Sequence, residues 1–202
     1  MPIYDSDGST SRQIARLWDN NGTTSSQISK VWDNDGTTSR LVYAAVVTIQ
    51  NSFTYVDDMA FTWQDVGDTY YYKKTATFYA VAGHRYVVQA RLDGWAYSGG
   101  SECRVIWEVQ IDRKISVVGH YGTNFNEFSY TDSCIYTATS TGTKDIEGYV
   151  KRYMSTQGKL SGEVLMVVDV TELENMRGTQ FGSAQEFIDK YGTFTGSKEV
   201  EV

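Results

Sequence analysis

The chain has 202 residues, with 18 basic and 25 acidic side chains and a formal net charge of -7 at pH 7. No cluster of Lys and Arg stands out, which argues against nucleic acid as a partner because phosphate binding needs a basic stripe. With 15 Tyr, 5 Trp and 1 Pro, the composition favours an all-β protein, long enough for one core and a small appendage.

One short phrase occurs three times in the first 43 residues, at a spacing of 14 residues. It is YDSDG at 4–8, WDNNG at 18–22 and WDNDG at 32–36, and a Ser/Thr run follows each copy. The phrase predicts a tight turn, because Asp and Asn bond the backbone locally and Gly accepts a positive φ. The stretches between the turns, such as 23–32, are rich in Thr, Ile, Val and Trp and predict strands. The block is therefore expected to form a short β-meander or fibre-like shaft.

The DSDG and DNDG sequences also resemble the start of a calcium-binding loop. An EF-hand loop needs a bidentate Glu at its twelfth position. That position holds Arg16 when counted from Asp5 and Ala44 when counted from Asp33. The turn is therefore preferred, and no metal site is predicted.

The repeats carry few apolar side chains, so a three-stranded piece is marginally stable by itself. Its unprotected strand edges favour pairing with copies of the same chain or with a larger assembly. The predicted assembly residues are the regularly spaced apolar and Trp positions: Ile14, Trp18, Ile28, Trp32 and Val42. By analogy with viral fibres, we expect a homotrimer.

An apolar run at 41–50 either completes the last repeat or leads the chain into the main domain. We place the boundary near Ala45. Residues 1–45 are then a segment for assembly and attachment, and residues 46–202 form the main domain.

Alternating apolar and polar residues predict the strands of the main domain. The clearest strand runs from Cys103 to Ile111, and Trp107 is predicted as the central core residue because Val105 and Val109 share its face. Further strands are expected near 61–63, 76–80, 86–92, 115–118, 126–130, 134–139, 144–154 and 163–170. Short strands separated by Gly, Asn, Asp and Ser predict an antiparallel β-sandwich of the jelly-roll kind.

Two capping boxes, TELE from Thr171 and SAQE from Ser183, predict two short helices. Each helix is expected to end at a glycine, Gly178 or Gly192. Cys103 and Cys134 lie in separate predicted strands and are expected to be core thiols. Whether they pair stays open.

No charged and apolar leader opens the chain, and no run of about 18 apolar residues occurs in it. We therefore expect a soluble product without a membrane partner. If it works outside a cell, it leaves by a route such as lysis.

The chain shows no catalytic signature, so no residue is predicted to be catalytic. Glycan hydrolysis needs two positioned carboxylates, and the candidates all lie in turn-like stretches: Asp57, Asp58, Asp65, Asp68, Glu102 and Glu127. His84 and His120 lack the spacing of a zinc site. No cofactor is expected.

Aromatic residues give a better indication of a ligand site. Trp95 and Tyr97 stand beside glycines in a predicted loop at 93–100, where core packing hardly explains a large ring. Ring faces beside polar groups suit sugars, and the predicted polar partners are Arg91, Asp93 and Glu102. Tyr70, Tyr71 and Tyr72 are consecutive, so at least one of them faces away from the core of a strand. The alternative, for all these rings, is that they line the rim of the sandwich or a trimer interface.

Two parts of the chain resemble known families. The 14-residue repeats resemble those of small structural proteins of bacteriophages and prophages of Gram-positive hosts. The stretch 165–173, with Phe187 and the closing 191–196, is similar to the end of carbohydrate-binding-like jelly-roll domains in phage tail and fibre proteins.

This resemblance implies a non-enzymatic virion protein on the exterior of a phage particle, made in the host cytoplasm and released by lysis. Its implied partners are copies of itself, other virion proteins and host-surface glycan. The alternative is a secreted or surface glycan-binding module, or a glycan-degrading enzyme, of bacterial origin. Head, tail, baseplate and fibre locations all stay open.

Overall fold

The computed structural model describes residues 4–6, 11–13, 17–20, 25–28, 30–34, 39–44, 46–62, 70–98, 104–122, 125–153 and 156–202. The chain divides into two compact units. One comprises Met1–Ile49, Thr171–Gln180 and Lys198–Val202, and the other comprises Gln50–Val170 and Phe181–Ser197. No helix among the described residues is long and apolar enough to cross a membrane.

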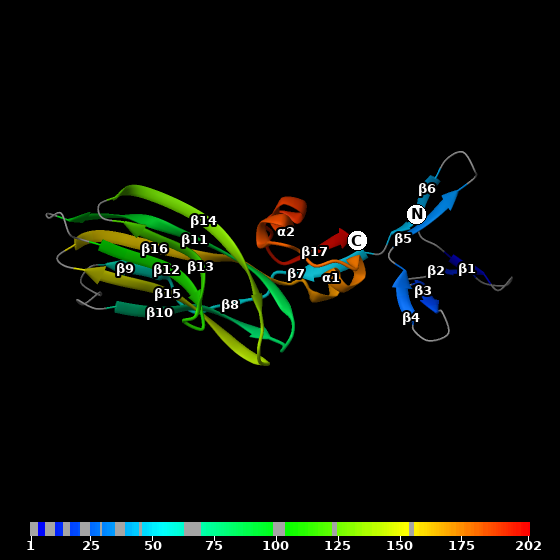
Figure 1. The fold of residues 1–202 in the computed structure, drawn as a ribbon, viewed down its shortest axis with the longest axis horizontal. Helices are drawn as coiled ribbons and strands as arrows, with labels where there is room; N and C mark the ends of the chain where they lie inside the picture. The colour runs from blue at the N-terminus through cyan, green and yellow to red at the C-terminus, as the bar shows by residue number, and fades with distance from the viewer. Residues whose placement is uncertain are drawn as a thin grey trace. The chain divides into compact units, whose positions relative to one another are not determined.

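The repeats form three separate antiparallel hairpins (Figure 1). Their strands are β1 (Tyr4–Ser6) with β2 (Ser11–Gln13), β3 (Leu17–Asn20) with β4 (Ser25–Ile28), and β5 (Lys30–Asn34) with β6 (Ser39–Ala44). Each phrase therefore begins in the first strand of a hairpin and runs towards its tip, as a turn signal predicts. The glycines Gly8, Gly22 and Gly36 lie outside the described residues.

This arrangement differs from the meander that the sequence suggested. In a meander, the segment between two turns is one strand that pairs on both sides. Here Ser25–Ile28 and Lys30–Asn34 belong to different two-stranded sheets. Among the predicted assembly residues, Ile14 lies outside the described residues. The others lie on hairpin strands whose backbone is described: Trp18 on β3, Ile28 on β4, Trp32 on β5 and Val42 on β6.

The apolar run at 41–50 is divided between two strands. Its first part completes the last hairpin as β6, and its second part forms β7 (Val46–Gln50). β7 pairs with β17 (Ser197–Glu201) from the end of the chain. The helix α1 (Thr171–Arg177) belongs to the same unit as this pair and has two acidic residues in its first turn, which suits the positive end of the helix dipole.

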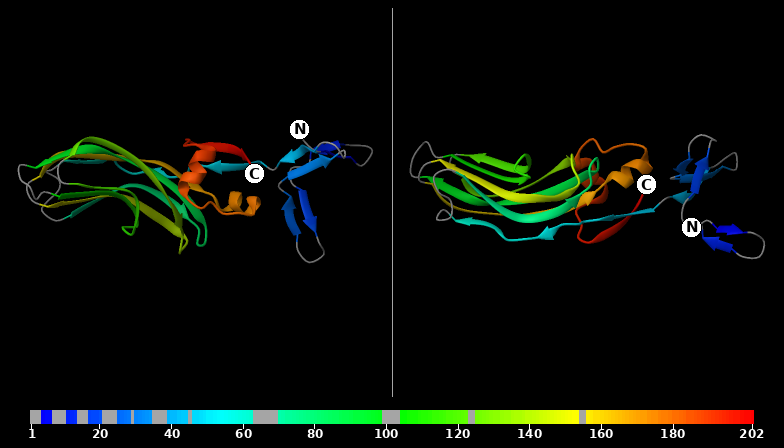
Figure 2. Two further views of the ribbon diagram at one scale, coloured as in Figure 1. Left: turned by 45° about the horizontal axis from the view of Figure 1, so that its top comes forward. Right: turned by 90° about the horizontal axis from the view of Figure 1, so that it is seen from below.

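The larger unit is a sandwich of two antiparallel sheets (Figures 1 and 2). The strands, in chain order, are β8 (Thr54–Tyr55), β9 (Met59–Thr62), β10 (Tyr70–Ala80), β11 (Arg85–Ser98), β12 (Arg104–Ile111), β13 (Ile115–Gly122), β14 (Phe125–Thr137), β15 (Gly142–Tyr153) and β16 (Thr156–Asp169). One sheet has the order β13-β12-β15-β10-β8, and the other has the order β14-β11-β16-β9.

The pairing is nested, as in a jelly roll. β12 pairs with β13, β11 with β14, β10 with β15, and β9 with β16, and every pair is antiparallel. The four pairs alternate between the two sheets. The pairing of β12 with β15 joins the first and third pairs into one sheet, and the pairing of β11 with β16 joins the second and fourth pairs into the other. The predicted all-β jelly-roll sandwich is confirmed, with its two short helices.

The core lies between the inner faces of the two sheets. Trp107 is fully buried, at 0% exposure, and its ring meets Phe61 edge to face at 4.9 Å between centroids. Val109 and Ile111 continue the same buried face of β12, as the alternation predicted. Cys134 packs against this core, and burial raises the pKa of its thiol to about 11. The Cys134 thiol is therefore protonated at neutral pH. Cys103 lies outside the described residues.

Helix α2 (Ala184–Tyr191) covers part of the outer face of the β14-β11-β16-β9 sheet. Phe181, Phe187 and Tyr191 form a buried aromatic cluster, and the helix contacts β11 and β14. The predicted cap is present, since Ser183 accepts a hydrogen bond from the Glu186 amide. The Glu186 carboxylate in turn accepts a hydrogen bond from the Gly182 amide at 2.8 Å.

Five strands, β10, β11, β13, β14 and β16, are longer than the sequence suggested. The stretches at 126–130 and 134–139 belong to one strand, β14, because the polar residues between them continue the ladder with β11. The predicted loop at 93–100 is wrong for residues 93–98, which continue β11. Gly94 is a strand glycine rather than a loop glycine, because a Cβ there would lie 2.5 Å from the Lys159 carbonyl of the neighbouring strand.

Candidate functional site

The outer face of the β14-β11-β16-β9 sheet is covered at one end and open at the other. At the covered end, Val87 is fully buried and Thr193, which follows α2, donates a hydrogen bond to Gln89 at 2.6 Å. Further along the same face of β11 come Arg91, Asp93 and Trp95. The Trp95 side chain is 42% exposed, so this end of the face presents a large ring to solvent.

A shallow groove of about 440 Å³ surrounds Trp95. It is lined by Asp93, Gly94, Trp95, Glu127, Phe128, Ser129, Lys159 and Ser161. The strand register explains this set, since Asp93 pairs with Ser129 on one side and with Ser161 on the other, and Trp95 pairs with Lys159. Residues paired in this way share a face of the sheet. We call this the Trp95 groove.

The Trp95 groove combines one exposed ring with both acceptors and donors. Asp93 and Glu127 contribute carboxylates, Lys159 an ammonium group, and Ser129 and Ser161 hydroxyls. β14 carries one extra residue opposite Trp95, because Gly94 pairs with Phe128 but Ala96 pairs with Phe125. Such bulges redirect side chains locally, and this one lies next to Glu127.

The predicted polar partners differ in their placement. The Arg91 guanidinium binds Asp93 at 3.0 Å and Glu163 at 2.8 Å, so it orients the Asp93 carboxylate beside the groove. For Tyr97 only the backbone is described, as part of β11, and Glu102 lies outside the described residues. The sequence reasoning missed Lys159, Ser129 and Ser161. Only the register of strands far apart in the chain could have indicated them.

A second aromatic surface lies on the outer face of the other sheet. Tyr70 and Tyr72 point outward from β10, whereas Tyr71 packs edge to face against the core residue Phe61 at 5.4 Å. The expectation that at least one of the three tyrosines faces away from the core is therefore confirmed. The Tyr72 ring lies 4.7 Å from that of Tyr149, and the Arg113 guanidinium lies 4.5 Å from its centroid. The Tyr72 ring thus already contacts another ring and a cation.

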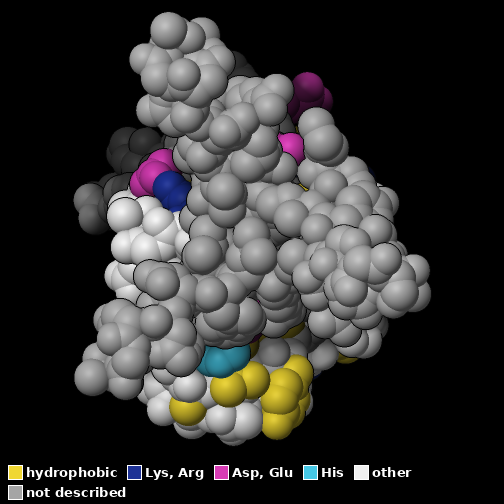
Figure 3. Space-filling view, turned by 90° about the vertical axis from the view of Figure 1, so that its right-hand side faces the viewer, with side chains coloured by type: hydrophobic (Ala, Val, Ile, Leu, Met, Phe, Trp, Pro, Cys, Tyr) yellow, Lys and Arg dark blue, Asp and Glu magenta, His cyan; other side chains and the backbone are white. Residues whose placement is uncertain are grey.

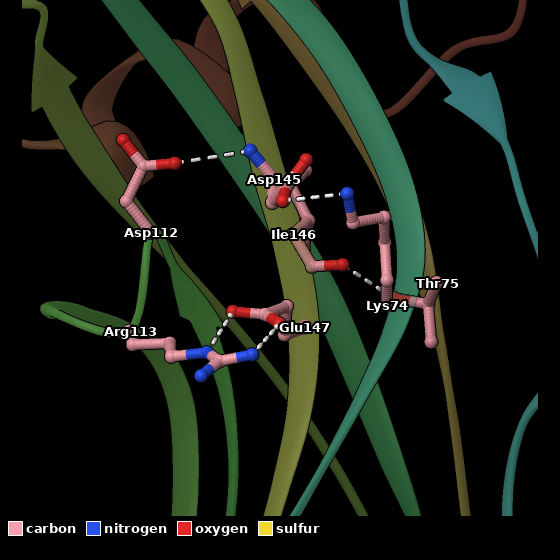
Figure 4. A network of polar contacts seen from close by, with 7 residues as sticks. All are labelled: Lys74, Thr75, Asp112, Arg113, Asp145, Ile146 and Glu147. Atoms are coloured by element: carbon pink, nitrogen blue, oxygen red, sulfur yellow. Dashed lines mark hydrogen bonds and ion pairs between the residues drawn. The ribbon is translucent and has the colours of Figure 1, made fainter.

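A polar network fixes Arg113 over this surface (Figure 4). Asp112 and Arg113 form the turn between β12 and β13 with φ of 49° and 58°. Such values are costly for residues other than glycine, so other contacts must hold the turn. The Asp112 carboxylate accepts from the Asp145 amide at 3.0 Å, and Arg113 binds the buried Glu147 in a bidentate pair at 2.9 and 3.0 Å. This surface is built as a self-contained network rather than as an open groove.

The histidines also have structural environments. His84 Nδ1 lies 2.6 Å from an Asp169 carboxylate oxygen. The His120 ring stacks on Phe128 and Tyr130 at 4.8 and 4.9 Å, and burial lowers its pKa. In Figure 3, hydrophobic side chains gather next to a histidine on the face shown. Among the described residues, no three His, Cys, Asp or Glu side chains are grouped to hold a metal ion.

The fold and the groove together define an all-β jelly-roll protein with an open aromatic groove on one sheet. No protein family matches this chain, and no curated protein matches it in sequence. Among solved structures, a chain from the structure of infectious bursal disease virus Gx strain is similar at a TM-score of 0.33 and 11% identity. The match covers 72% of this chain and 41% of that chain.

Proposed function

We propose that this protein is a non-enzymatic structural component of a bacteriophage or prophage virion, exposed on the particle, whose jelly roll binds host-surface glycan through the Trp95 groove. The observation that carries the glycan part is the exposed Trp95 ring with carboxylates, hydroxyls and an ammonium group around it. The virion part rests on the resemblance of the repeats and of the C-terminal stretch to phage structural proteins.

The chemistry of the groove suits a sugar. The C–H face of a pyranose packs against an aromatic ring, while its hydroxyls need both donors and acceptors. Trp95 pairs with Lys159 of β16, and its neighbours Gly94 and Ala96 pair with β14 on the other side, so the strand that carries it is held by two neighbours. Rigid presentation limits the entropy lost on binding. An open groove of this kind binds weakly at a single site, and several copies on one particle raise the effective affinity.

Replacing Trp95 with alanine is expected to weaken retention on purified host cell walls by about tenfold or more, since it removes the stacking surface at the centre of the groove. Pull-down of the full chain on those walls measures the effect. The matched control is Tyr79→Ala, which removes an exposed ring that does not line the groove and should leave retention unchanged. Both variants must melt as the wild type does.

Equal retention of wild type and Trp95→Ala would remove the groove from the proposal. If neither protein is retained, the purely structural, decorating role is favoured. The bacterial alternative, a glycan-binding module or a glycan-degrading enzyme, predicts neighbouring genes without virion functions. Virion genes on either side would exclude it.

We further propose that the repeat hairpins mediate assembly into a homotrimer and attachment to other virion proteins. The hairpins are two-stranded sheets, and two-stranded sheets are marginal in water unless further strands or another surface cover them. Light scattering of the full chain is expected to give three times the monomer mass. The same measurement on residues 46–202 should give a monomer. A monomeric full-length chain in free solution would contradict the assembly role.

A further inference from the structure

A second cavity lies within the sandwich unit, at the corner where the chain passes from β8 in one sheet to β9 in the other. Its volume is about 380 Å³, within the range of small-molecule sites. It is lined by Phe53, Tyr55, Asp57, Asp58, Met59, Thr75, Ala76, Gly162, Glu163 and Val164. We call it the corner pocket. None of these residues lines the Trp95 groove.

Two β-bulges shape the corner pocket. Thr75 is the extra residue of β10, because Lys74 pairs with Glu147 and Ala76 with Ile146. The freed Thr75 carbonyl accepts from the amides of Val56 and Asp57, at 2.8 and 3.3 Å, and so holds the crossing segment. Leu165 is the extra residue of β16 and directly follows the lining residue Val164. Bulges of this kind often lie next to binding sites.

The floor of the corner pocket is apolar and continuous with the core. Met59 and Ala76 are buried, and Phe53 and Val164 pack against the core cluster. A Cβ at Gly162 would lie 2.8 Å from the Met59 sulfur, so the glycine allows Met59 to lie close against β16. Because packed cores deform little, the floor is a preformed surface that a small apolar body can cover.

The charged residues that line the corner pocket are all acidic: Asp57, Asp58 and Glu163. The cations that pair with two of them, Lys73 with Asp57 at 3.3 Å and Arg91 with Glu163 at 2.8 Å, do not line the pocket. The Asp58 carboxylate accepts a hydrogen bond from the neutral Tyr55 hydroxyl. That bond, with desolvation and the charges of Asp58 and Asp57, raises the pKa of Tyr55 to about 12. The described lining of the corner pocket therefore carries three carboxylates and no cationic side chain.

We propose that the corner pocket binds a small organic ammonium ion, with its apolar body on the Met59 floor and its charged nitrogen at the Asp58 side of the rim. An ammonium group donates hydrogen bonds to carboxylates and is attracted by their negative charge. A compact metal ion fits less well, because no three His, Cys, Asp or Glu side chains of the described residues, those of the pocket included, are grouped closely enough to hold one. The corner pocket and the Trp95 groove share no lining residue, so this proposal can be tested independently of glycan binding.

Cyclohexylammonium and cyclohexanol are the probes, since they have the same body and differ in charge. Ligand-observed NMR titration of the full chain at neutral pH is expected to give a Kd on the order of 1 mM for the amine and at least about tenfold weaker binding of the alcohol. Raising the salt concentration to about 1 M should weaken binding of the amine and leave that of the alcohol unchanged.

Asp58→Asn is the variant that locates the site. The amide oxygen can still accept from Tyr55, so the fold is kept while the charge is lost. Binding of the amine should weaken about tenfold, as one lost charge–charge contact of about 1.4 kcal/mol predicts. Glu127→Gln removes a carboxylate of the Trp95 groove instead and should leave the amine affinity unchanged. Equal affinity for the two probes, no binding of the amine, or an effect of Glu127→Gln equal to that of Asp58→Asn would overturn the proposal.

Discussion

Replacing Trp107 with alanine is expected to lower the free energy of unfolding by about 3 to 5 kcal/mol. The indole is fully buried between the two sheets and packs edge to face on Phe61. Its neighbours Val109 and Val150 are also buried, on β12 and β15. The surrounding strands are paired on both sides and cannot collapse into the space, so a cavity remains. Urea unfolding followed by circular dichroism measures the loss.

The matched control is Trp95→Ala, which removes the same side chain from an exposed position and should cost under about 1 kcal/mol. Trp107→Phe adds a sharper comparison. The buried Trp107 Nε1–H has no hydrogen-bond partner among the described residues, and an unsatisfied buried donor is destabilising. Phenylalanine keeps much of the ring and removes that donor, so it should cost clearly less than alanine. An unchanged melting temperature for Trp107→Ala would place this face of β12 in solvent.

The sequence alone predicted the features that depend on local pattern. The alternation around Trp107 correctly predicted which face of β12 is buried, because the side-chain period of a strand is fixed at two. The Ser183 cap and the Gly192 stop were predicted for the same reason, since each depends on a few neighbouring residues. The phrases indicated tight turns, but their spacing could not show whether neighbouring strands pair into the single meander that was expected or into three two-stranded sheets.

The candidate sites were harder to predict from the sequence, because they depend on the register between strands. Trp95 was singled out by its glycine neighbours, but Gly94 proved to allow the close approach of β16 rather than a loop. Lys159 and Ser161 lie more than 60 residues further along the chain than Trp95 and Asp93, and only the pairing of β11 with β16 places them together. The corner pocket depends on two bulges, at Thr75 and Leu165. No local pattern in the sequence specifies a single extra residue in a long strand.

Replacing Asn51 with alanine is expected to lower the free energy of unfolding by about 2 to 4 kcal/mol. Its Nδ2 donates to the carbonyls of Leu165 and Phe194 at 3.1 and 2.8 Å, and its Oδ1 accepts from the Val167 amide at 2.8 Å. The side chain therefore connects the start of the sandwich unit to the bulge in β16 and to the segment after α2. Alanine leaves three backbone groups without this partner at a half-buried site.

Asn51→Asp tests whether the donors of the amide matter, since a carboxylate keeps the acceptor and places negative charge against two carbonyl oxygens. It should be at least as destabilising as alanine at neutral pH and should recover part of the loss at low pH, where the protonated acid can again donate. Ser52→Ala, at the exposed neighbouring position, should change stability by under about 0.5 kcal/mol. Thermal and urea unfolding at two pH values measure all three variants. If Asn51→Ala lowers the free energy of unfolding no more than Ser52→Ala does, the stability of the sandwich does not depend on the Asn51 hydrogen bonds. The segment after α2 would then be held by α2 and its aromatic cluster.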